Sequence, residues 1–269
     1  MSEKDDRTIE MFMEIDASTG AVWKALTDAE ELVRWFPLKA EIEPRVGGRY
    51  WMSWGVEFDG ESRIEIFEPE RHLRTTWPSV TKQDGKPTEL AVDYHLEARE
   101  GRTALRLVHS GFGRGANWDE EYEGVNTGWM FELRSLRHYL GRHRGKDRHA
   151  LFLVGPKTDL TGPEVWSRVV RDGFGASDPT GLSEGDRCSF PVGEGTVFEG
   201  TVLDSTSRQL AMTVDGLHDA IFRIEVFAAR PHLWLAAWGE GRDAVARFEG
   251  PWREMLERVL PKDEGSQKA

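Results

Sequence analysis

The sequence predicts an α+β protein of two tandem units, each a curved antiparallel sheet covered by a long helix. Three observations predict this fold class. Segments with a period of two residues follow one another between residues 45 and 109, as consecutive antiparallel strands do. A longer amphipathic helix comes next, and its apolar stripe is formed by Trp129, Leu133, Leu136 and Leu140. Short motifs of the first half then return in the second half in the same order.

Two short helices are expected between the first strand and the rest of the sheet. Residues 9–15 mix apolar and acidic residues as a strand does, and Ser18 is then the expected N-cap of a helix. Asp28 is the candidate cap of a second helix, whose inner face consists of Leu32, Trp35 and Phe36. We expect this second segment to lie near the mouth of a cavity, as part of a lid.

The strands that follow are predicted from alternation, with turns at residues 58–60, Pro69, residues 82–87 and residues 100–101. An apolar sheet face of this kind needs cover, and the helix near residues 129–140 is the largest candidate. The sets of alternating residues, one set for each strand, are Tyr50, Met52 and Trp54; Ser62, Ile64 and Ile66; Leu73, Thr75 and Trp77; Leu90, Val92, Tyr94 and Leu96; and Leu105, Leu107 and His109.

Four sets of residues recur with their order kept, and the spacing between matched residues falls along the chain, as deletions in a second copy require. The sets pair Asp16, Val22 and Trp23 with Asp159, Val165 and Trp166; Arg71 and Leu73 with Arg208 and Leu210; Glu97 and Leu105 with Glu225 and Leu233; and Trp129, Leu133 and Leu136 with Trp252, Leu256 and Val259.

The recurrence predicts two domains, at residues 8–142 and 150–262, joined by the polar and basic stretch 141–149. Thr161 and Glu164 have the spacing of a capping box at the start of the returning helix. Since the second copy has no clear counterpart of the segment with Trp35 and Phe36, it is expected to be degenerate.

Composition limits the possible partners. Lys and Arg number 35 against 47 Asp and Glu, and the net charge of −12 disfavours nucleic-acid phosphates and anionic lipid. The single cysteine, Cys188, excludes an internal disulfide framework and fits a reducing compartment. The stretch MSEKDDRTIEMF lacks the apolar run of a signal peptide, and no stretch reaches the roughly 18 apolar residues of a membrane span. We therefore expect a cytoplasmic protein.

Five stretches within about residues 8–142 resemble, in order, the signatures of a known superfamily: IDASTGAVWKALTDAEELVRWF, GGRY, FEPERHLRTTW, TALRLVHSGF and GWMFELRSLRHYL. They resemble the SRPBCC, or START-like, superfamily, and within it the domains related to the C-terminal domain of the heat-shock-protein-90 ATPase activator. The resemblance implies a helix-grip fold with a cavity between sheet and helix. Members bind lipids, polyketides, hormones or other apolar molecules, and some are cyclases, aromatases or hydrolases. For residues 150–262 the resemblance is faint.

The many aromatic residues, among them 11 Trp and 13 Phe, fit either a large core or an aromatic-walled cavity. His109 and Tyr94 are the catalytic candidates, because an imidazole at a cavity wall can act as acid or base and a phenol can orient a ligand oxygen. Both residues also fit a structural role with ordinary hydrogen bonds. The candidate ligand-binding residues are Trp35, Phe36, Trp54, Trp77, Tyr94, His109, Trp129 and Leu133.

Two common enzyme and metal signatures lack support in the sequence. The G-x-G spacings at residues 111–115 and 193–200 lie outside any predicted βαβ unit, and no H-E-x-x-H motif is present. With one cysteine, we expect no zinc cluster, no other metal and no cofactor. The acidic stretch 118–126 is interpreted as a solvated loop.

Three functions remain open. The first is non-enzymatic binding of a small apolar or aromatic molecule, for sequestration, transport or stress response. The second is a cyclase or hydrolase that uses His109 with a nearby tyrosine or acid. The third is a protein-interaction or co-chaperone-like module. We expect the first unit to hold the better cavity and Trp129 to form part of its wall.

Overall fold

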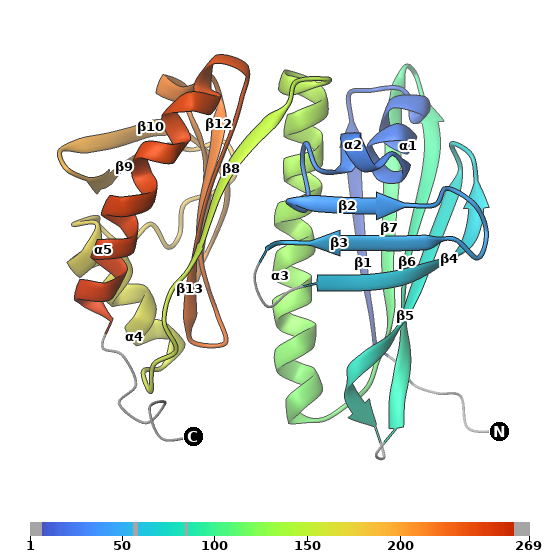
Figure 1. Ribbon diagram of the computed structural model, residues 1–269, viewed down its shortest axis with the longest axis horizontal. Helices are drawn as coiled ribbons and strands as arrows, with labels where there is room; N and C mark the ends of the chain where they lie inside the picture. Colours follow the sequence, from blue (N-terminus) through green and yellow to red (C-terminus); the bar gives the residue numbers. More distant parts are fainter. Residues whose placement is uncertain (1–6, 56–58, 84–85, 261–269) are drawn as a thin grey trace. The chain divides into compact units, whose positions relative to one another are not determined.

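The computed structural model describes residues 7–55, 59–83 and 86–260, which divide into two compact units, Met1–Gly145 and Lys146–Ala269 (Figure 1). Two predicted turns, at residues 58–60 and 82–87, lie partly outside the described residues. No helix in the described ranges is long and apolar enough to cross a membrane.

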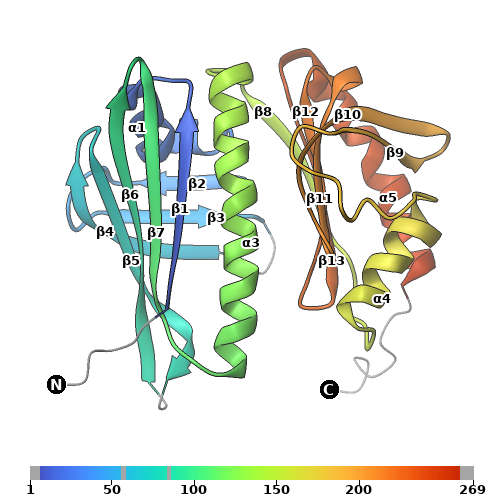
Figure 2. The same cartoon turned by 180° about the vertical axis from the view of Figure 1, so that it is seen from behind.

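The first unit is a seven-stranded antiparallel sheet with α3 lying along one of its faces (Figures 1 and 2). The strands are ordered β1-β7-β6-β5-β4-β3-β2, so the first strand pairs with the last. The elements are β1 (Arg7–Ile15), α1 (Thr19–Thr27), α2 (Ala29–Leu32), β2 (Lys39–Ile42), β3 (Arg49–Ser53), β4 (Asp59–Glu68), β5 (His72–Gln83), β6 (Lys86–Arg99), β7 (Arg102–Phe112), α3 (Ala116–His138) and a π-helical turn, η1 (Tyr139–His143).

The strand register places the predicted alternating residues in buried rows across the sheet. One row joins Leu73, Tyr94 and Leu107 through direct cross-strand pairs. The next row joins Thr75, Val92 and His109 in the same way. All six side chains are buried, which confirms the predicted face at these positions. The inward position of His109 follows directly from the two-residue period of β7.

The predicted alternation is wrong at Ile66. The register between β4 and β5 shifts between Ile64 and Ile66, so Ile66 lies opposite Arg74 while Phe67 lies opposite Leu73. Such a bulge inserts one residue and thereby reverses the faces of the residues that follow. Trp54 also lies just beyond the end of β3.

Both predicted caps of the first two helices are confirmed. The Ser18 hydroxyl accepts the backbone N–H of Ala21 at 3.3 Å, and the Asp28 carboxylate accepts that of Glu31 at 3.1 Å. These bonds satisfy N–H groups that have no partner within the first helical turn. The long helix, however, begins at Ala116, so the stretch interpreted as a loop is part of α3.

The early start of α3 has a packing cause. Trp118 and Tyr122 both contact Phe112 at the end of β7, with ring centroids 6.3 and 5.3 Å apart. Trp118, Tyr122, Val125 and Trp129 follow at helical spacing, an apolar stripe that the surrounding acidic residues hide in the sequence.

The segment after α2 is fixed to α1 and α3 by buried hydrogen bonds. Trp35 Nε1 donates to the carbonyl of Ala25 at 2.9 Å, and the Ser135 hydroxyl donates to the carbonyl of Trp35 at 3.0 Å. The Tyr139 hydroxyl donates to Glu31 Oε2 at 2.5 Å. Burial raises the pKa of the Glu31 carboxyl, but this bond, together with Lys24 and Arg34, lowers it overall.

The second unit is a six-stranded antiparallel sheet ordered β8-β13-β12-β11-β10-β9, with α4 and α5 on one face (Figure 1). Its elements are β8 (Arg148–Val154), α4 (Gly162–Ser167), η2 (Arg168–Gly173), β9 (Arg187–Gly193), β10 (Thr196–Thr206), β11 (Gln209–Val214), η3 (Asp215–Leu217), β12 (Ala220–Phe227), β13 (Arg230–Trp238), η4 (Gly239–Phe248) and α5 (Glu249–Val259).

The two sheets follow the same path: the first strand pairs with the last, and the rest pair with their neighbours in sequence. The predicted fold class, α+β with two antiparallel units, is therefore confirmed. The capping box of Thr161 and Glu164 is present at α4. The second unit has one strand fewer, and its last helix has 11 residues against 23 in α3. That the second unit is a degenerate copy of the first stays a prediction.

Gly111 and Gly101 provide a matched test of how closely β7 approaches β6. Both have a positive φ, of 96° and 86°, but a Cβ at Gly111 would lie 2.1 Å from the carbonyl oxygen of Glu89, whereas a Cβ at Gly101 would meet nothing within 4 Å. We expect Gly101→Ala to lower the free energy of unfolding by about 1 kcal/mol through backbone strain alone. Gly111→Ala should lower it by a further ~1–3 kcal/mol, because the strands must separate. Denaturant unfolding of both variants measures this, and equal losses would contradict the close approach.

Candidate functional site

A cluster of aromatic side chains gathers between α3 and the sheet of the first unit. Trp129 is at its centre, with ring centroids 5.7 Å from Phe36, 6.0 Å from Tyr94 and 6.1 Å from His109. Phe36 also contacts Trp54 at 5.3 Å. Trp77 lies 5.2 Å from His109, and these six residues, Phe36, Trp54, Trp77, Tyr94, His109 and Trp129, are called the aromatic cluster below.

The cluster draws its members from distant parts of the chain. Trp77, Tyr94 and His109 lie on the adjacent strands β5, β6 and β7, and all three occupy the inward face. Trp129 faces them from α3, and its neighbour on the inner side of that helix, Leu133, is fully buried. Phe36 follows α2, where the hydrogen bonds of Trp35 hold the backbone.

Trp129 Nε1 donates a buried hydrogen bond to His109 Nδ1 at 2.9 Å. An indole N–H can only donate, so His109 Nδ1 must be the unprotonated, accepting nitrogen. In the neutral imidazole the other nitrogen then carries the proton. The tautomer of His109 is therefore the Nε2–H form.

That Nε2–H group has no hydrogen-bond partner within the described residues, although the side chain is only 3 % exposed. Burial lowers the pKa of His109 to about 3. The imidazole thus stays neutral near pH 7, with its lone pair engaged by Trp129. Such a group is well suited to donate a hydrogen bond and poorly suited to accept a proton.

Tyr94 is limited in the same way. Burial, with smaller contributions from Tyr50 and Glu132, raises the pKa of its phenol well above the ordinary value. The hydroxyl therefore remains protonated and is available as a hydrogen-bonding group. Neither catalytic candidate has the protonation behaviour that a general base needs at neutral pH.

A second buried donor lies at the same end of the unit. Trp118 Nε1 has no hydrogen-bond partner within the described residues. Its ring contacts Phe112, and the Phe112 ring lies 4.5 Å from that of His109. Sequence reasoning missed Phe112 and Trp118 because both precede the recognised stripe. The helical spacing from Trp118 to Trp129 is the signal that would have found Trp118.

The structure thus brings together six of the predicted site residues and places the other two beside them. Trp35 is 1 % exposed, and its N–H donates to the backbone carbonyl of Ala25. Its ring stacks on that of Phe36 at 5.0 Å, so it contacts the cluster through Phe36. Trp54 and Trp77 are half-buried and form the part of the cluster that solvent reaches. The ligand-binding role of all eight residues stays a prediction.

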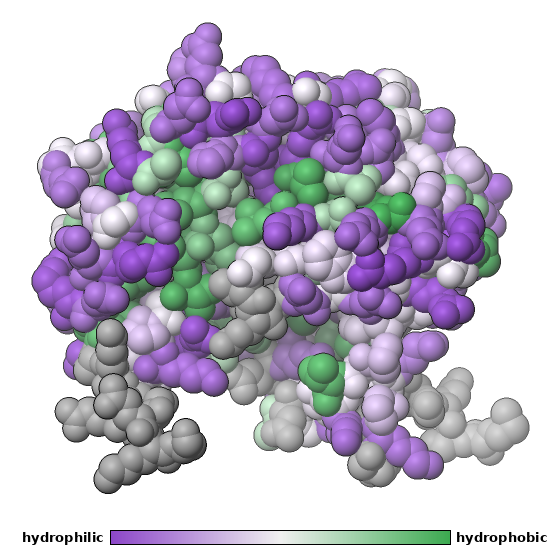
Figure 3. Space-filling model, in the orientation of Figure 1, coloured by the Kyte–Doolittle hydropathy of each residue, from purple (hydrophilic) through white to green (hydrophobic). Residues whose placement is uncertain are grey.

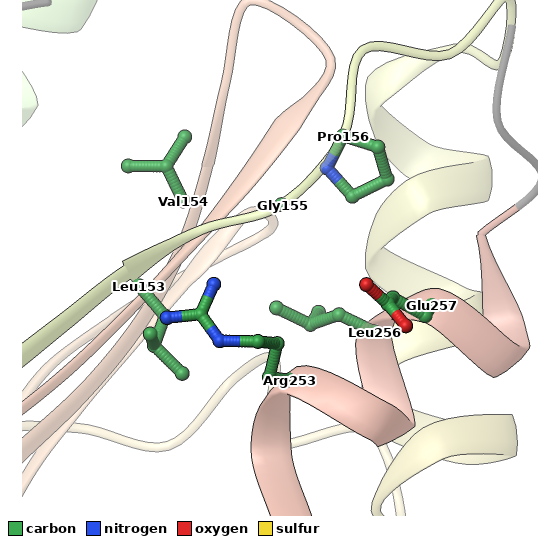
Figure 4. A pocket seen from close by; sticks show the side chains of 7 residues that line it. All are labelled: Leu153, Val154, Gly155, Pro156, Arg253, Leu256 and Glu257. Carbon is green, nitrogen blue, oxygen red and sulfur yellow. The ribbon is translucent and has the colours of Figure 1, made fainter. Parts of the chain in front are cut away.

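The described residues also form two surface pockets, the first of which shares Trp77 with the aromatic cluster. One in the first unit, of about 300 Å³, is lined partly by Arg49, Glu61 and Trp77; there Arg49 Nε donates to Glu61 at 2.8 Å. The other, in the second unit, has about 140 Å³ and lies between the end of β8 and α5, with Arg253 and Glu257 at its edge (Figure 4). Figure 3 shows apolar residues at the surface in the region of β8 and α5. The second pocket is smaller than the ~300–1,000 Å³ usual for ligand pockets.

Comparison with known proteins finds a family to which the first unit is similar. Residues 16–141 match the family described as Activator of Hsp90 ATPase homolog 1-like protein. No curated protein matches the chain.

Solved structures with a similar chain include three of particular interest. MLL2253 from Mesorhizobium loti is 25% identical, over 50% of this chain and 97% of its own, with a TM-score of 0.44. CalU16 from Micromonospora echinospora is 26% identical, over 50% and 76% of the two chains, with a TM-score of 0.41. DynU16, from the dynemicin biosynthetic locus, is 19% identical over 93% and 96%, with a TM-score of 0.44.

The tautomer and neutrality of His109 can be observed directly. In long-range 15N–1H NMR spectra, we expect His109 to show the pattern of the Nε2–H tautomer and no titration between pH 8 and 5, because its pKa is about 3. The His109→Asn variant assigns the signal. An imidazole that titrates near pH 6.5 would contradict the assigned burial.

The same pKa predicts an acid sensitivity. In the unfolded chain His109 takes up a proton near pH 6.5, whereas the folded protein holds it neutral down to about pH 3. Its contribution to stability is therefore fully present above pH 6.5 and is lost as the pH falls toward 3, by at most about 1.4 kcal/mol per pH unit.

Trp129 and Trp118 form a matched pair for testing the hydrogen bond. Trp129→Phe leaves the buried Nδ1 acceptor of His109 without its donor, and we expect a loss of about 1–3 kcal/mol beyond the effect of the smaller ring. Trp118→Phe makes the same change in size but removes a donor that has no partner, so it should cost less. Thermal and denaturant unfolding give both values. A larger loss for Trp118→Phe would show that the bond does not stabilise the cluster.

Proposed function

We propose that the first unit, whose residues 16–141 match the Activator of Hsp90 ATPase homolog 1-like family, binds a small apolar or aromatic molecule carrying a hydrogen-bond acceptor. One observation carries the proposal: His109, a member of the aromatic cluster, has a buried Nε2–H without a hydrogen-bond partner in the described residues. An unsatisfied buried donor costs about 1–3 kcal/mol. A ligand oxygen that accepts the His109 N–H would remove this free-energy cost, which favours binding of such a ligand.

The rest of the cluster suits the apolar part of such a ligand. The ring centroids of Phe36 and Tyr94 lie 5.7 and 6.0 Å from that of Trp129. Rings grouped in this way favour contacts with flat molecules. The half-buried Trp54 and Trp77 are the side chains from which a ligand would enter. The protonated Tyr94 hydroxyl offers a further hydrogen bond to a ligand oxygen.

A binding role explains the site better than catalysis does. The Nδ1 lone pair of His109 accepts from Trp129, and its low pKa removes the drive to take up a proton. A cyclase or hydrolase that needs this residue as a base therefore lacks support from the geometry. Sequestration or transport needs only the donor and the aromatic walls.

A protein-interaction role is the second candidate. The family description names an activator homologue of a chaperone ATPase, which suggests a protein partner. Phe12 is 71 % exposed on β1, the edge strand of the first sheet, and a large apolar side chain at an edge is a common feature of contact surfaces.

We also propose that the protein acts in the cytoplasm. The single cysteine, Cys188, is a buried free thiol, and burial raises its pKa, so it remains in the unreactive protonated form. This suits a reducing compartment, where a structural thiol needs no partner.

A pair of probes with the same apolar body tests the proposed function. We expect 2-acetylnaphthalene to bind the full chain about 5–10-fold more tightly than 2-ethylnaphthalene, because only the ketone accepts the His109 N–H. Quenching of tryptophan fluorescence and isothermal titration calorimetry measure both affinities. His109→Phe keeps an aromatic ring without the donor, and it should remove the preference while retaining binding of the hydrocarbon.

Two outcomes would count against the proposal in different ways. Failure of both probes to bind would remove the binding function itself. Equal binding, unchanged in His109→Phe, would leave an apolar site in which His109 has no role. Phe12→Ala serves as the control, since it alters an exposed side chain of the same unit and should change neither affinity.

A further inference from the structure

The outer face of the first sheet carries a second group of functional side chains. His72 on β5 lies directly opposite His95 on β6, and their rings stack with centroids 4.1 Å apart. Asp93 is two residues before His95, so both point to the same face. Tyr94, between them, points inward to the aromatic cluster. The group is therefore separated from the proposed ligand site by the thickness of the sheet.

We propose that His72, Asp93 and His95 bind a divalent transition-metal ion such as Zn²⁺. Each residue offers one ligand atom, and these atoms all lie within 4.8 Å of one another. Two imidazole nitrogens and one carboxylate oxygen form a ligand set that Zn²⁺ accepts, with bonds of about 2.0–2.2 Å. Both histidines are only half-buried, which leaves room for water as a fourth ligand.

Neighbouring charges orient the carboxylate for this task. Arg74 Nη1 donates to Asp93 Oδ2 at 2.6 Å, and Arg74 Nε donates to Glu65 at 3.0 Å. The remaining oxygen, Asp93 Oδ1, lies 2.7 Å from His72 Nε2. Outer contacts of this kind fix the direction of metal-binding carboxylates. Asp93 is thus presented through a single oxygen.

The contact between His72 and Asp93 indicates how a metal would enter. A hydrogen bond now joins His72 Nε2 and Asp93 Oδ1, and a metal ion would take its place, with the neutral imidazole carrying its proton on Nδ1 while Nε2 binds the metal. Tetrahedral bonds of about 2 Å place two ligand atoms roughly 3.3 Å apart, so the side chains need to separate by only about half an ångström. Binding would also require the His95 ring, now stacked on His72, to direct a nitrogen toward the metal.

Sequence reasoning assigned no metal ligand here because the residues do not form a linear motif. His72 and Asp93 are distant in the chain, and only the pairing of β5 with β6 brings them together. The D-x-H spacing of residues 93–95 on a strand is visible in the sequence and places both side chains on one face. The position of His72 beside them depends on the strand register, which the sequence does not show.

Metal titration of the full chain tests the proposal. After removal of bound metal with EDTA, we expect Zn²⁺ to bind with an affinity that falls at least ~100-fold in His72→Gln, in His95→Gln and in Asp93→Asn, since each removes a ligand. Isothermal titration calorimetry measures the affinities. With Co²⁺, the wild-type chain should show the intense visible absorption of tetrahedral coordination, and the three variants should lose it.

Controls separate the site from incidental histidine binding and from unfolding. His149→Gln changes an exposed histidine of β8 and should leave Zn²⁺ and Co²⁺ binding unchanged. Binding of apolar probes reports the opposite face of the sheet and should persist in all variants, which shows that they are folded. Zn²⁺ affinity that is unchanged in the three variants, or absent in the wild-type chain, would overturn the proposal.

Discussion

The hydrogen bond from Trp129 to His109 links the two layers of the first unit and determines the chemistry between them. It joins α3 to β7 at 2.9 Å, in a position where water does not compete. Because the indole can only donate, one contact sets the orientation of the imidazole, its tautomer and the location of its remaining proton. Burial then keeps the ring neutral. A packing contact between helix and sheet thus also leaves the Nε2–H of His109 as a buried donor.

The alternation of β6 assigns different chemistry to the two faces of one sheet. Tyr94 points inward to the aromatic cluster, whereas Asp93 and His95 point outward to His72 and Arg74. Among the described residues, the inner face carries the unpaired donor of His109, whereas Asp93 on the outer face has hydrogen bonds to His72 and Arg74. The two proposed sites therefore share a strand but no side chain. A change in one leaves the ligands of the other in place, and so their functions can be tested independently.

Much of this arrangement could be predicted from the sequence because it follows from short-range rules. The two-residue period located the inward face of β5, β6 and β7, and the cap at Ser18 located α1. The errors arise where the outcome depends on contacts between distant residues. The bulge that moves Ile66 outward is set by pairing with β5, and the early start of α3 depends on Trp118 meeting Phe112.

The second unit has the same strand order as the first but no histidine at the position matched to His109. The internal matches that pair Leu105 with Leu233 place Ala237 where the first unit has His109, and Ala237 is fully buried. Trp252, matched to Trp129, instead donates to the backbone carbonyl of Val192 at 3.0 Å. Its ring lies among buried phenylalanines, 5.4 Å from Phe222.

The indole N–H groups of Trp129 on α3 and Trp252 on α5 therefore have different kinds of acceptor. In the second unit the tryptophan N–H donates to a backbone carbonyl, and the surrounding rings belong to the buried apolar core. In the first unit the Trp129 N–H donates to His109 Nδ1. The second nitrogen of that imidazole, Nε2, then carries a proton and has no hydrogen-bond partner in the described residues. A protein core normally supplies such a partner, because a buried unpaired donor destabilises it. The unpaired donor beside half-buried aromatic rings is the reason why we propose ligand binding for the first unit.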